Sequence, residues 1–193
     1  MIFLATDNND VVYFATSNKH KLKEAEAVLS DFGITVKHFP FKHVELRSDS
    51  LEEIAREAVA LAFKRCHQPI FVEDTGLFIE TLNGFPGTFS AWVQGKIGNT
   101  GILNIMSNQA NRRAYFETCI AYKKDAGHIA TFKGHCNGQI TTEERGKGGF
   151  GYDPIFIPDG EDQTFAESIT LKNKLSHRYK SLLEFSKSIK TRK

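Results

Sequence analysis

Two adjacent acids, Glu73 and Asp74, follow a short apolar run in the motif VEDTG, and Glu45 is a further acid after another apolar stretch. Carboxylate oxygens are hard ligands, and Mg²⁺ is commonly held by one or two of them, with water and phosphate oxygens completing the octahedron. Acids at the end of a strand are also common as plain solvated groups. Thr75 and Gly76 favour a ligand, since they allow a close backbone approach. The acids therefore mark a candidate magnesium site.

Basic residues gather where two helices are expected to begin. Lys19, Lys21 and Lys23 crowd the first turns of one helix, where the macrodipole disfavours each cation by several tenths of a kcal/mol. A phosphate bound there would reverse this effect, because free backbone amides and lysines would act together on one anion. The alternative is a solvated run of charge. The start of the last expected helix repeats the pattern with Lys172, Lys174, His177, Arg178 and Lys180. Two such starts favour a polyanionic ligand.

The segment GKGGFGYDPIF, residues 146–156, combines a free backbone with aromatic rings. Its glycines relax the constraints on backbone angles. Phe150 and Tyr152 offer flat faces to a base, and Asp153 offers an acceptor to the edge of a base. A glycine-rich turn with one aromatic residue is common in proteins, whereas two aromatics, an acid and Pro154 together are less so. The segment therefore predicts a nucleotide-binding loop.

Composition narrows the class of protein. The chain has 193 residues, of which 40% are hydrophobic and 25% charged, which is typical of a soluble globular protein rather than a disordered one. Its net charge of +2 is too small to predict a nucleic-acid or membrane partner. The cysteines are odd in number and form no CxxC pair, which indicates reduced thiols. With no secretory signal and no apolar run long enough to span a membrane, the protein is expected to be cytoplasmic.

Hydrophobic periodicity indicates an alternation of strands and helices. Strands are predicted at 11–16, 34–39, 70–72, 112–122 and 129–140, the last two as an antiparallel hairpin. Helices are predicted between the first two strands, over 51–65 and 176–188, and as two short pieces at 90–94 and 100–106. Ser50 and Glu53 form a capping box, and Ser176 is the expected cap of the last helix. The strand at 70–72 delivers Glu73 and Asp74 at its carboxyl end, where open α/β sheets bind ligands.

Five motifs occur in order along the chain: TSNKHK, EDTGL, FPG, GGFGYDPIF and LSHR. Together they resemble the inosine triphosphate pyrophosphatase (Ham1) family. The resemblance covers about residues 11–185 of a single domain spanning 1–193, with 1–10 as an N-terminal extension. It implies an α/β fold in which a long, bent, mixed β-sheet is flanked by helices and two lobes enclose a central cleft. It also implies a homodimer and a Mg²⁺-dependent hydrolysis of ITP, dITP and XTP to the monophosphate and pyrophosphate.

The resemblance assigns roles to individual residues. The residues implied in binding the substrate are Thr16, Ser17, Asn18, Lys19, His20, Lys21, Thr75, Phe150, Gly151, Tyr152, Asp153, Lys172, His177 and Arg178. Residues 16–18 and Lys21 would hold the triphosphate, and Lys172 would neutralise charge near the phosphates. Residues 150–153 would hold the base, and His177 and Arg178 would read its 6-oxo edge. Glu45 and Asp74 would hold Mg²⁺, with Asp49 as the alternative to Glu45, and Asp74 would also be the base for water. Some relatives have a further lysine in the second helix, where this chain offers Arg56.

Attack by water on the α phosphorus fits these motifs, because they contain no Ser or Cys paired with a His. The protein would position the triphosphate and neutralise charge on the departing pyrophosphate. Two other functions stay open: a nucleotide-binding regulator without turnover, and an RNA-binding module that uses the basic helix starts. The enzyme interpretation takes a purine nucleoside triphosphate as partner, with neither nucleic acid nor membrane, and predicts Mg²⁺-dependent release of pyrophosphate.

Overall fold

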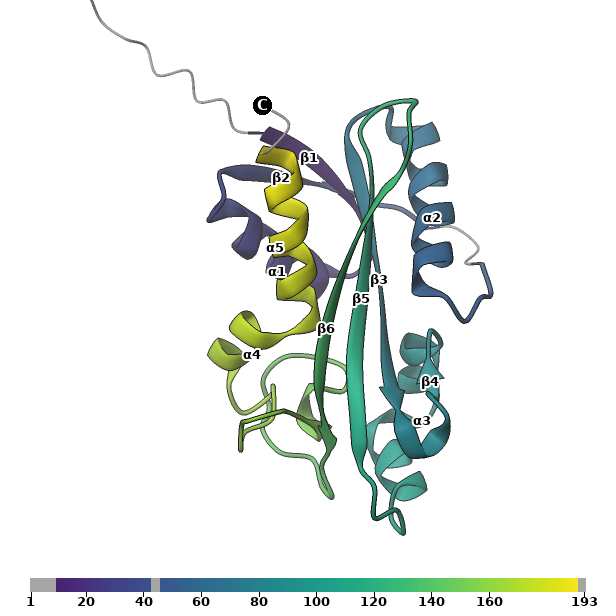
Figure 1. Cartoon of the computed structure of the whole chain (residues 1–193), viewed down its shortest axis with the longest axis vertical. Helices are drawn as coiled ribbons and strands as arrows, with labels where there is room; N and C mark the ends of the chain where they lie inside the picture. The colour runs from purple at the N-terminus through teal and green to yellow at the C-terminus, as the bar shows by residue number, and fades with distance from the viewer. Residues whose placement is uncertain (1–9, 43–45, 191–193) are drawn as a thin grey trace, which may run out of the picture.

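The structure, a computed structural model, describes residues 10–42 and 46–190. Within these residues one seven-stranded sheet has the order β2-β1-β3-β5-β6-β7, with β4 paired to β3 beside this path (Figure 1). The strands are β1 (Asp10–Ala15), β2 (Ile34–Phe39), β3 (Ile70–Ile79), β4 (Pro86–Gly87), β5 (Arg113–Lys123), β6 (Ala130–Ile140) and β7 (Phe156–Pro158). β1 pairs in parallel with β2 and β3, and the other pairs are antiparallel, so the predicted mixed sheet is confirmed.

Helices cover both faces of this sheet. They are α1 (Lys19–Ser30), α2 (Leu51–Cys66), α3 (Ser90–Ile105), α4 (Ile169–Leu175) and α5 (His177–Lys190), with 3₁₀ turns at Glu80–Leu82 and Asp153–Ile155. Successive side chains of a strand point to opposite faces. Accordingly, Val72 packs in one core with Val59 of α2, whereas Phe71 packs in another with Leu29 of α1 and Phe185 of α5. Figure 1 shows α2 on one side of the long strands and α1 with α5 on the other.

A third core lies at the other end of the long strands. There Ile102 of α3 packs with Leu77 of β3, Phe116 of β5 and Phe156 of β7. The strands β3, β5 and β6 run through both ends of the molecule and so join this core to the two beside α2 and α5 (Figure 1). A site in the middle of these strands therefore lies between buried cores, which hold the strands at both ends.

The turn from β1 to α1 places the first basic helix start at the end of a buried strand. β1 pairs with β2 up to Ala15↔Phe39, and the Thr16 amide donates to the Phe39 carbonyl at 3.3 Å. The Asn18 side chain caps α1, and Gly33, with a φ of 65°, turns the chain into β2. The predicted strand–helix–strand unit is confirmed.

β3 is longer than predicted. It does not end at Glu73 and Asp74, because β5 pairs with it along its length, from Ile70↔Lys123 to Ile79↔Ala114. The parallel neighbour β1 pairs with β3 only at Tyr13↔Ile70 and Phe14↔Phe71. The two acids therefore lie in the middle of a strand, yet just beyond the carboxyl end of the parallel strand beside it.

Three local predictions need correction. The short helices expected at 90–94 and 100–106 are parts of α3, which kinks at Gly98 (φ 62°, ψ −168°). The seven-residue helix α4, which the periodicity does not reveal, precedes α5. The capping box forms in part: the Ser50 hydroxyl accepts from the Glu53 amide at 3.3 Å, while the Ser50 amide donates to Ser48 Oγ at 3.0 Å. The Ser176 cap is confirmed, since its hydroxyl accepts from the Tyr179 amide at 3.2 Å.

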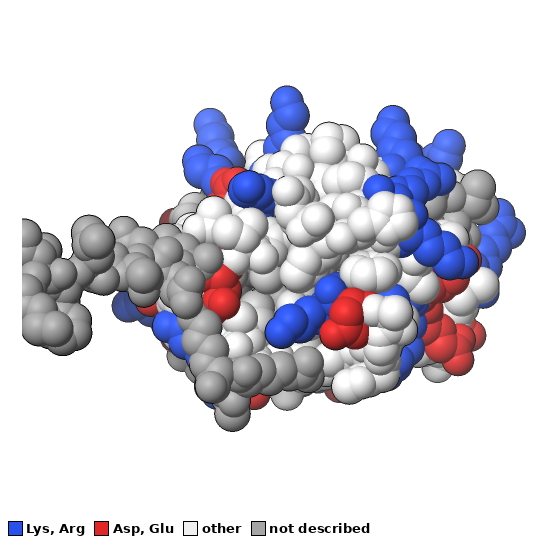
Figure 2. Space-filling view, turned by 90° about the horizontal axis from the view of Figure 1, so that it is seen from above, with Lys and Arg blue, Asp and Glu red and all other residues white. Residues whose placement is uncertain are grey.

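Seen from above, Lys and Arg side chains project mainly from the upper edge and the right side of the molecule, and uncharged residues fill most of the middle of this face (Figure 2). Among the described residues, no helix is long and apolar enough to cross a bilayer.

Candidate active site

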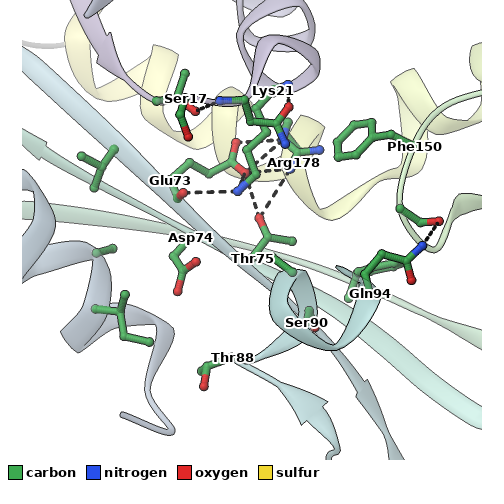
Figure 3. Close-up of a pocket in the computed structure, with 18 of the residues that line it drawn as sticks. Ser17, Lys21, Glu73, Asp74, Thr75, Thr88, Ser90, Gln94, Phe150 and Arg178 are labelled. Atoms are coloured by element: carbon green, nitrogen blue, oxygen red, sulfur yellow. Dashed lines mark hydrogen bonds and ion pairs between the residues drawn. The ribbon is translucent and has the colours of Figure 1, made fainter. Parts of the chain in front are cut away.

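A cavity of about 630 Å³ lies where β1 and β2 end, beside the middle of β3 (Figure 3). The predicted site residues that line it are Thr16, Ser17, Asn18, Lys21, Asp74, Thr75, Phe150, Gly151, Tyr152, Asp153, Lys172, His177 and Arg178. The fold thus brings together motifs that lie far apart in the sequence. Lys19, His20 and Asp49 are described but do not line the cavity, and Glu45 lies outside the described residues.

The start of α1 is already hydrogen-bonded. Asn18 Oδ1 accepts from the His20 amide at 2.9 Å and from the Lys21 amide at 3.2 Å. The Asn18 amide in turn donates to Thr16 Oγ1 at 3.1 Å. The expectation that these amides are free for a phosphate is therefore wrong for three of them. The polar residues of this segment that line the cavity are Thr16, Ser17, Asn18 and Lys21.

Glu73 has a fully buried side chain that two cations hold. Arg178 Nε lies 2.8 Å from Glu73 Oε2, and Arg178 Nη2 lies 2.8 Å from Oε1. Lys21 Nζ lies 3.3 Å from the same Oε1 (Figure 3). Burial by itself would raise the pKa of Glu73, but Arg178 and Lys21 outweigh it and hold this pKa well below its usual value. Glu73 is therefore an ionised anchor for two predicted site cations.

Glu24 of α1 extends these ion pairs to α4. Its Oε2 lies 2.7 Å from Arg178 Nη1, and its Oε1 lies 2.7 Å from Lys172 Nζ. Lys172 Nζ also lies 2.7 Å from Asp153 Oδ2. Lys172 and Arg178 are buried, so both charges need these partners. A chain of ion pairs thus joins α1, β3, α4, α5 and the start of the second 3₁₀ turn around the cavity.

Asp74 is separated from Glu73 by the geometry of the strand. Neighbouring residues of a strand point to opposite faces, and the Asp74 carboxylate is directed away from the ion pairs of Glu73 (Figure 3). The two acids therefore do not form a pair of ligands for one ion. Within the described residues there is also no cluster of three or more His, Cys, Asp or Glu side chains that could hold a metal ion. Asp74 is the acid of the pair that suits an ion bound jointly with a phosphate.

The glycine loop, residues 146–151, carries Phe150 to the cavity. The Phe150 ring stacks on His20 with a centroid distance of 5.1 Å, and Lys172 Nζ lies 4.1 Å from the Phe150 centroid. Tyr152 is buried, and its hydroxyl donates to the Ser90 carbonyl at 3.0 Å. Asp153 is also buried and accepts from the Phe150 amide at 2.7 Å. Tyr152 and Asp153 therefore hold the loop in place, and Phe150 supplies its half-buried flat face.

His177 is buried at the start of α5. Its ring stacks on Phe116, with centroids 4.5 Å apart and planes at 15°. Burial, together with the nearby charge of Arg178, lowers the pKa of His177 well below 6.5, so the ring is neutral at pH 7. Its Nδ1 atom has no hydrogen-bond partner among the described residues. The neutral ring lines the cavity, where it suits contact with a polar ligand edge.

The cavity also has walls that the sequence motifs do not include, among them Lys42, Thr88, Phe89, Ser90, Trp92 and Gln94. Most of these follow the FPG motif directly, which was the one local signal for them. On the opposite wall α2 presents the apolar side chains of Ile54, Ala55 and Ala58. Arg56 is turned out of the cavity and pairs with Glu52 at 3.0 Å, so it does not take the place of the lysine that some relatives have.

Comparisons with known proteins agree with this geometry. Residues 12–188 match the model of the Ham1 family. The chain is 49% identical to a dITP/XTP pyrophosphatase of Methanopyrus kandleri over 176 residues, 91% of this chain and 94% of the relative. It is 44% identical to a dITP/XTP pyrophosphatase of Thermococcus kodakarensis over 178 residues, 92% of this chain and 96% of the relative.

A solved structure agrees as well. The Staphylococcus aureus Ham1 protein matches with a TM-score of 0.82 and 28% identity, over 95% of this chain and all of that one. The match extends across the residues that build the cavity, so fold, motifs and overall sequence agree. This chain belongs to the Ham1 family.

Proposed function

We propose that this protein hydrolyses purine nucleoside triphosphates with a 6-oxo base, such as dITP, ITP and XTP, to the monophosphate and pyrophosphate. The observation that carries the proposal is one cavity that is lined both by Lys21 and Asp74 and by Phe150 and His177. The first pair suits a triphosphate and the second suits a purine. The names of the Methanopyrus and Thermococcus relatives, dITP/XTP pyrophosphatase, support it.

The phosphate side combines hydroxyls with a lysine. Thr16 and Ser17 present hydroxyl groups, and Lys21 adds a positive charge from the first turn of α1. Lys21 also contacts Glu73, which fixes its direction without removing all of its donors, since an ammonium has three. These groups would hold the β and γ phosphates and neutralise the charge that develops on pyrophosphate as it leaves.

Asp74 fits a magnesium ion that is held jointly with the substrate. Mg²⁺ usually binds through one or two carboxylates, with phosphate oxygens and water as its other ligands, and Asp74 presents a carboxylate to the cavity. Glu45, which lies outside the described residues, would be a second ligand. When bound, Mg²⁺ would neutralise phosphate oxygens as a Lewis acid.

Asp74 would also orient the attacking water and accept its proton. The water oxygen would form a bond to the α phosphorus while the bond from this phosphorus to the α,β-bridging oxygen breaks. The pyrophosphate would leave toward Lys21. A nucleoside monophosphate and pyrophosphate are the products, with no covalent intermediate on the chain.

Selectivity would come from donors at the base side. A guanidinium has five N–H donors, and Arg178 directs Nε and Nη2 to Glu73, Nη1 to Glu24, and Nη2 also to Thr75 Oγ1 at 3.5 Å. The remaining N–H group of Nη1, with His177, would face the 6-oxo group of the purine. The 6-amino group of adenine would place donor against donor, which costs about 1–3 kcal/mol for each unpaired buried group. ATP should therefore be a poor substrate.

We further propose a homodimer in the cytoplasm. Phe85, Phe89 and Trp92 are 41%, 45% and 65% exposed around β4 and the start of α3, and such groups of large apolar side chains commonly mark contact surfaces. Light scattering of the purified protein would measure its mass directly.

The cysteines bear on the compartment. Cys66, Cys119 and Cys136 form no disulfide within the described residues, which supports a reducing compartment.

One assay tests the activity. Purified protein is given XTP, dITP, ITP or ATP with and without Mg²⁺, and pyrophosphate and orthophosphate are measured separately. We expect Mg²⁺-dependent pyrophosphate release from the first three, far above that from ATP. Nucleotide binding without turnover would favour the regulator. Salt-sensitive binding to RNA without turnover would favour the RNA-binding module. Orthophosphate as the product would contradict cleavage between the α and β phosphates.

A further inference from the structure

Two side chains of helix α3 donate hydrogen bonds to the chain on either side of the glycine loop. Gln94 Nε2 donates to the Gly151 carbonyl at 3.1 Å, at the end of the loop. Asn99 Nδ2 donates to Glu144 Oε2 at 3.3 Å, just before the loop begins. The two amides are joined to each other, since Gln94 Nε2 also lies 3.3 Å from Asn99 Oδ1. Figure 3 shows Gln94 reaching from α3 to this carbonyl beside Phe150.

The kink in α3 allows Gln94 and Asn99 to form these hydrogen bonds together. Gly98 has a φ of 62° and a ψ of −168°, so the helix stops and restarts at Asn99. Asn99 is 9% exposed and opens the second helical piece. From there its side chain reaches both Gln94 and Glu144. A straight helix would place residues five apart on different faces, so they would not meet.

The direction of the Gln94 amide follows from its partners. The Gly151 carbonyl only accepts hydrogen bonds, so the nitrogen of Gln94 must face it. The Gln94 Oε1 atom is then buried with no hydrogen-bond partner among the described residues. An unpartnered buried carbonyl disfavours folding. The Gln94 oxygen therefore costs stability, while its nitrogen donates to the Gly151 carbonyl and contacts Asn99.

What the donors position is the backbone around Phe150. Gly151 has a φ of 63°, and a Cβ added to it would meet no atom within 4 Å, so packing does not hold this residue. On its other side Phe150 is fixed by its own amide, which donates to Asp153 Oδ2 at 2.7 Å. The Phe150 carbonyl also accepts from the Asp153 amide, at 3.3 Å. Gln94 supplies the anchor at Gly151, the next residue of the segment that carries the Phe150 ring.

We propose that Gln94 is a positioning residue for the base of the substrate and acts through Gly151 on Phe150. This inference rests on the proposed function, in which Phe150 stacks on the purine. Loss of the anchor leaves Phe150 present, with its ring contacts to His20 and Lys172, but on a backbone that is held less firmly. Affinity for the nucleotide then falls, whereas affinity for a phosphate chain without a base does not.

The test measures binding without turnover. XTP is titrated in EDTA, and binding is followed through the fluorescence of Trp92, the single tryptophan, which lines the cavity. Gln94→Met keeps the length of the side chain and removes both donors. We expect the Kd for XTP to rise about tenfold, as for the loss of one or two hydrogen bonds. The Kd for inorganic tripolyphosphate should stay within about twofold.

The matched control is Gln109→Met, at a half-buried glutamine that does not line the cavity. It should leave both Kd values unchanged. If Gln94→Met does not fold well, Asn99→Ala keeps the Gln94 bond to Gly151 and removes the second arm, and it should shift the XTP Kd in the same direction by a smaller factor.

A double-mutant cycle tests the route. In a Phe150→Ala background, adding Gln94→Met should leave the Kd for XTP unchanged, because the ring that Gln94 positions is absent. An equal rise in both backgrounds, an unchanged Kd in the native background, or equal losses for XTP and tripolyphosphate would each overturn the inference. A native protein that binds XTP but releases no pyrophosphate would instead refute the proposed turnover.

Discussion

Arg178 and Glu73 form a two-pronged ion pair inside the molecule, with Nε to Oε2 and Nη2 to Oε1 both at 2.8 Å. The Arg178 side chain is 3% exposed and that of Glu73 is fully buried. Two charges so far from water stabilise the fold only as a pair, because either one alone would keep its desolvation cost. The pair joins the middle of β3 to the first turn of α5 and so fixes the position of His177.

Glu73→Gln should lower the free energy of unfolding by about 3–5 kcal/mol, since it leaves the Arg178 charge buried with fewer partners. Urea unfolding at pH 7 measures this change. The matched control is Glu184→Gln, which breaks the exposed pair between Glu184 and Lys187 and should cost less than about 1 kcal/mol. Equal effects of the two substitutions would show that the buried pair contributes no more to the free energy of unfolding than an exposed pair.

The role of Glu24 could not be predicted from the sequence. Its partner Arg178 lies 154 residues away in the chain, and no local pattern in α1 distinguishes Glu24 from Glu26. The motifs around Lys21, Asp74, Phe150 and Arg178 could be predicted because unusual residue types cluster within each of them. The ion pairs between these motifs depend on how helices pack across the sheet, so only the structure reveals them.

Among the strands too, some limits could be predicted from the sequence and others could not. Residues 34–39 were predicted to the residue, because Gly33 precedes them and apolar and polar side chains alternate over residues 34–37. The end of β3 was wrong because pairing with β5, not the composition of residues 73–79, extends the strand. Residues 43–45, which include the predicted ligand Glu45, lie outside the described residues, so this prediction stays open.

Asp74→Asn should reduce kcat for XTP by about 100-fold or more, because an amide cannot take the proton of the attacking water. The fold should be unaffected, as judged by urea unfolding. Asp162→Asn is the matched control, since Asp162 is an exposed acid that does not line the cavity. Near-native turnover by Asp74→Asn would remove this residue from the chemistry.

Lys21→Ala should raise KM for XTP roughly tenfold or more, as for the loss of a hydrogen bond to a charged group. Inhibition by inorganic tripolyphosphate should weaken by a similar factor, because Lys21 would contact phosphate rather than the base. Lys19→Ala is the matched control: it removes an exposed lysine two residues away that does not line the cavity. If Lys19→Ala has the larger effect, the phosphate side has been assigned to the wrong lysine.

Gly134→Ala should destabilise the protein by about 1–3 kcal/mol, because β6 and α5 touch at this glycine. A Cβ there would overlap the His177 carbonyl oxygen and would lie 2.6 Å from the Ser181 amide nitrogen. Activity should fall with stability, since α5 carries His177 and Arg178. By contrast, Gly95→Ala, in α3 with no atom within 4 Å of the added carbon, should stabilise the protein by roughly 0.5–1 kcal/mol. Thermal unfolding of the two variants measures both signs.

His177 should make stability depend on pH in a definite direction. Burial lowers its pKa well below 6.5 in the folded protein, with Arg178, Lys172 and Lys21 acting in the same sense and Glu73 opposing them. Above pH 6.5 neither state is protonated at His177. Below pH 6.5 the unfolded chain binds a proton that the folded protein does not, so the free energy of unfolding falls by up to about 1.4 kcal/mol per pH unit.

The acid Glu73 acts in a lower window and can be separated from this effect. Its folded pKa lies below 4.5, so its contribution is complete above pH 4.5 and is lost only as the pH falls further. Urea unfolding at pH 7.5, 6.5 and 5.5 therefore measures the slope above the range in which Glu73 acts. His177→Gln, which cannot be protonated, should remove most of the slope between pH 6.5 and 5.5. An identical slope in the variant would mean that the ring is already charged in the folded state, and the buried, neutral His177 would have to be given up.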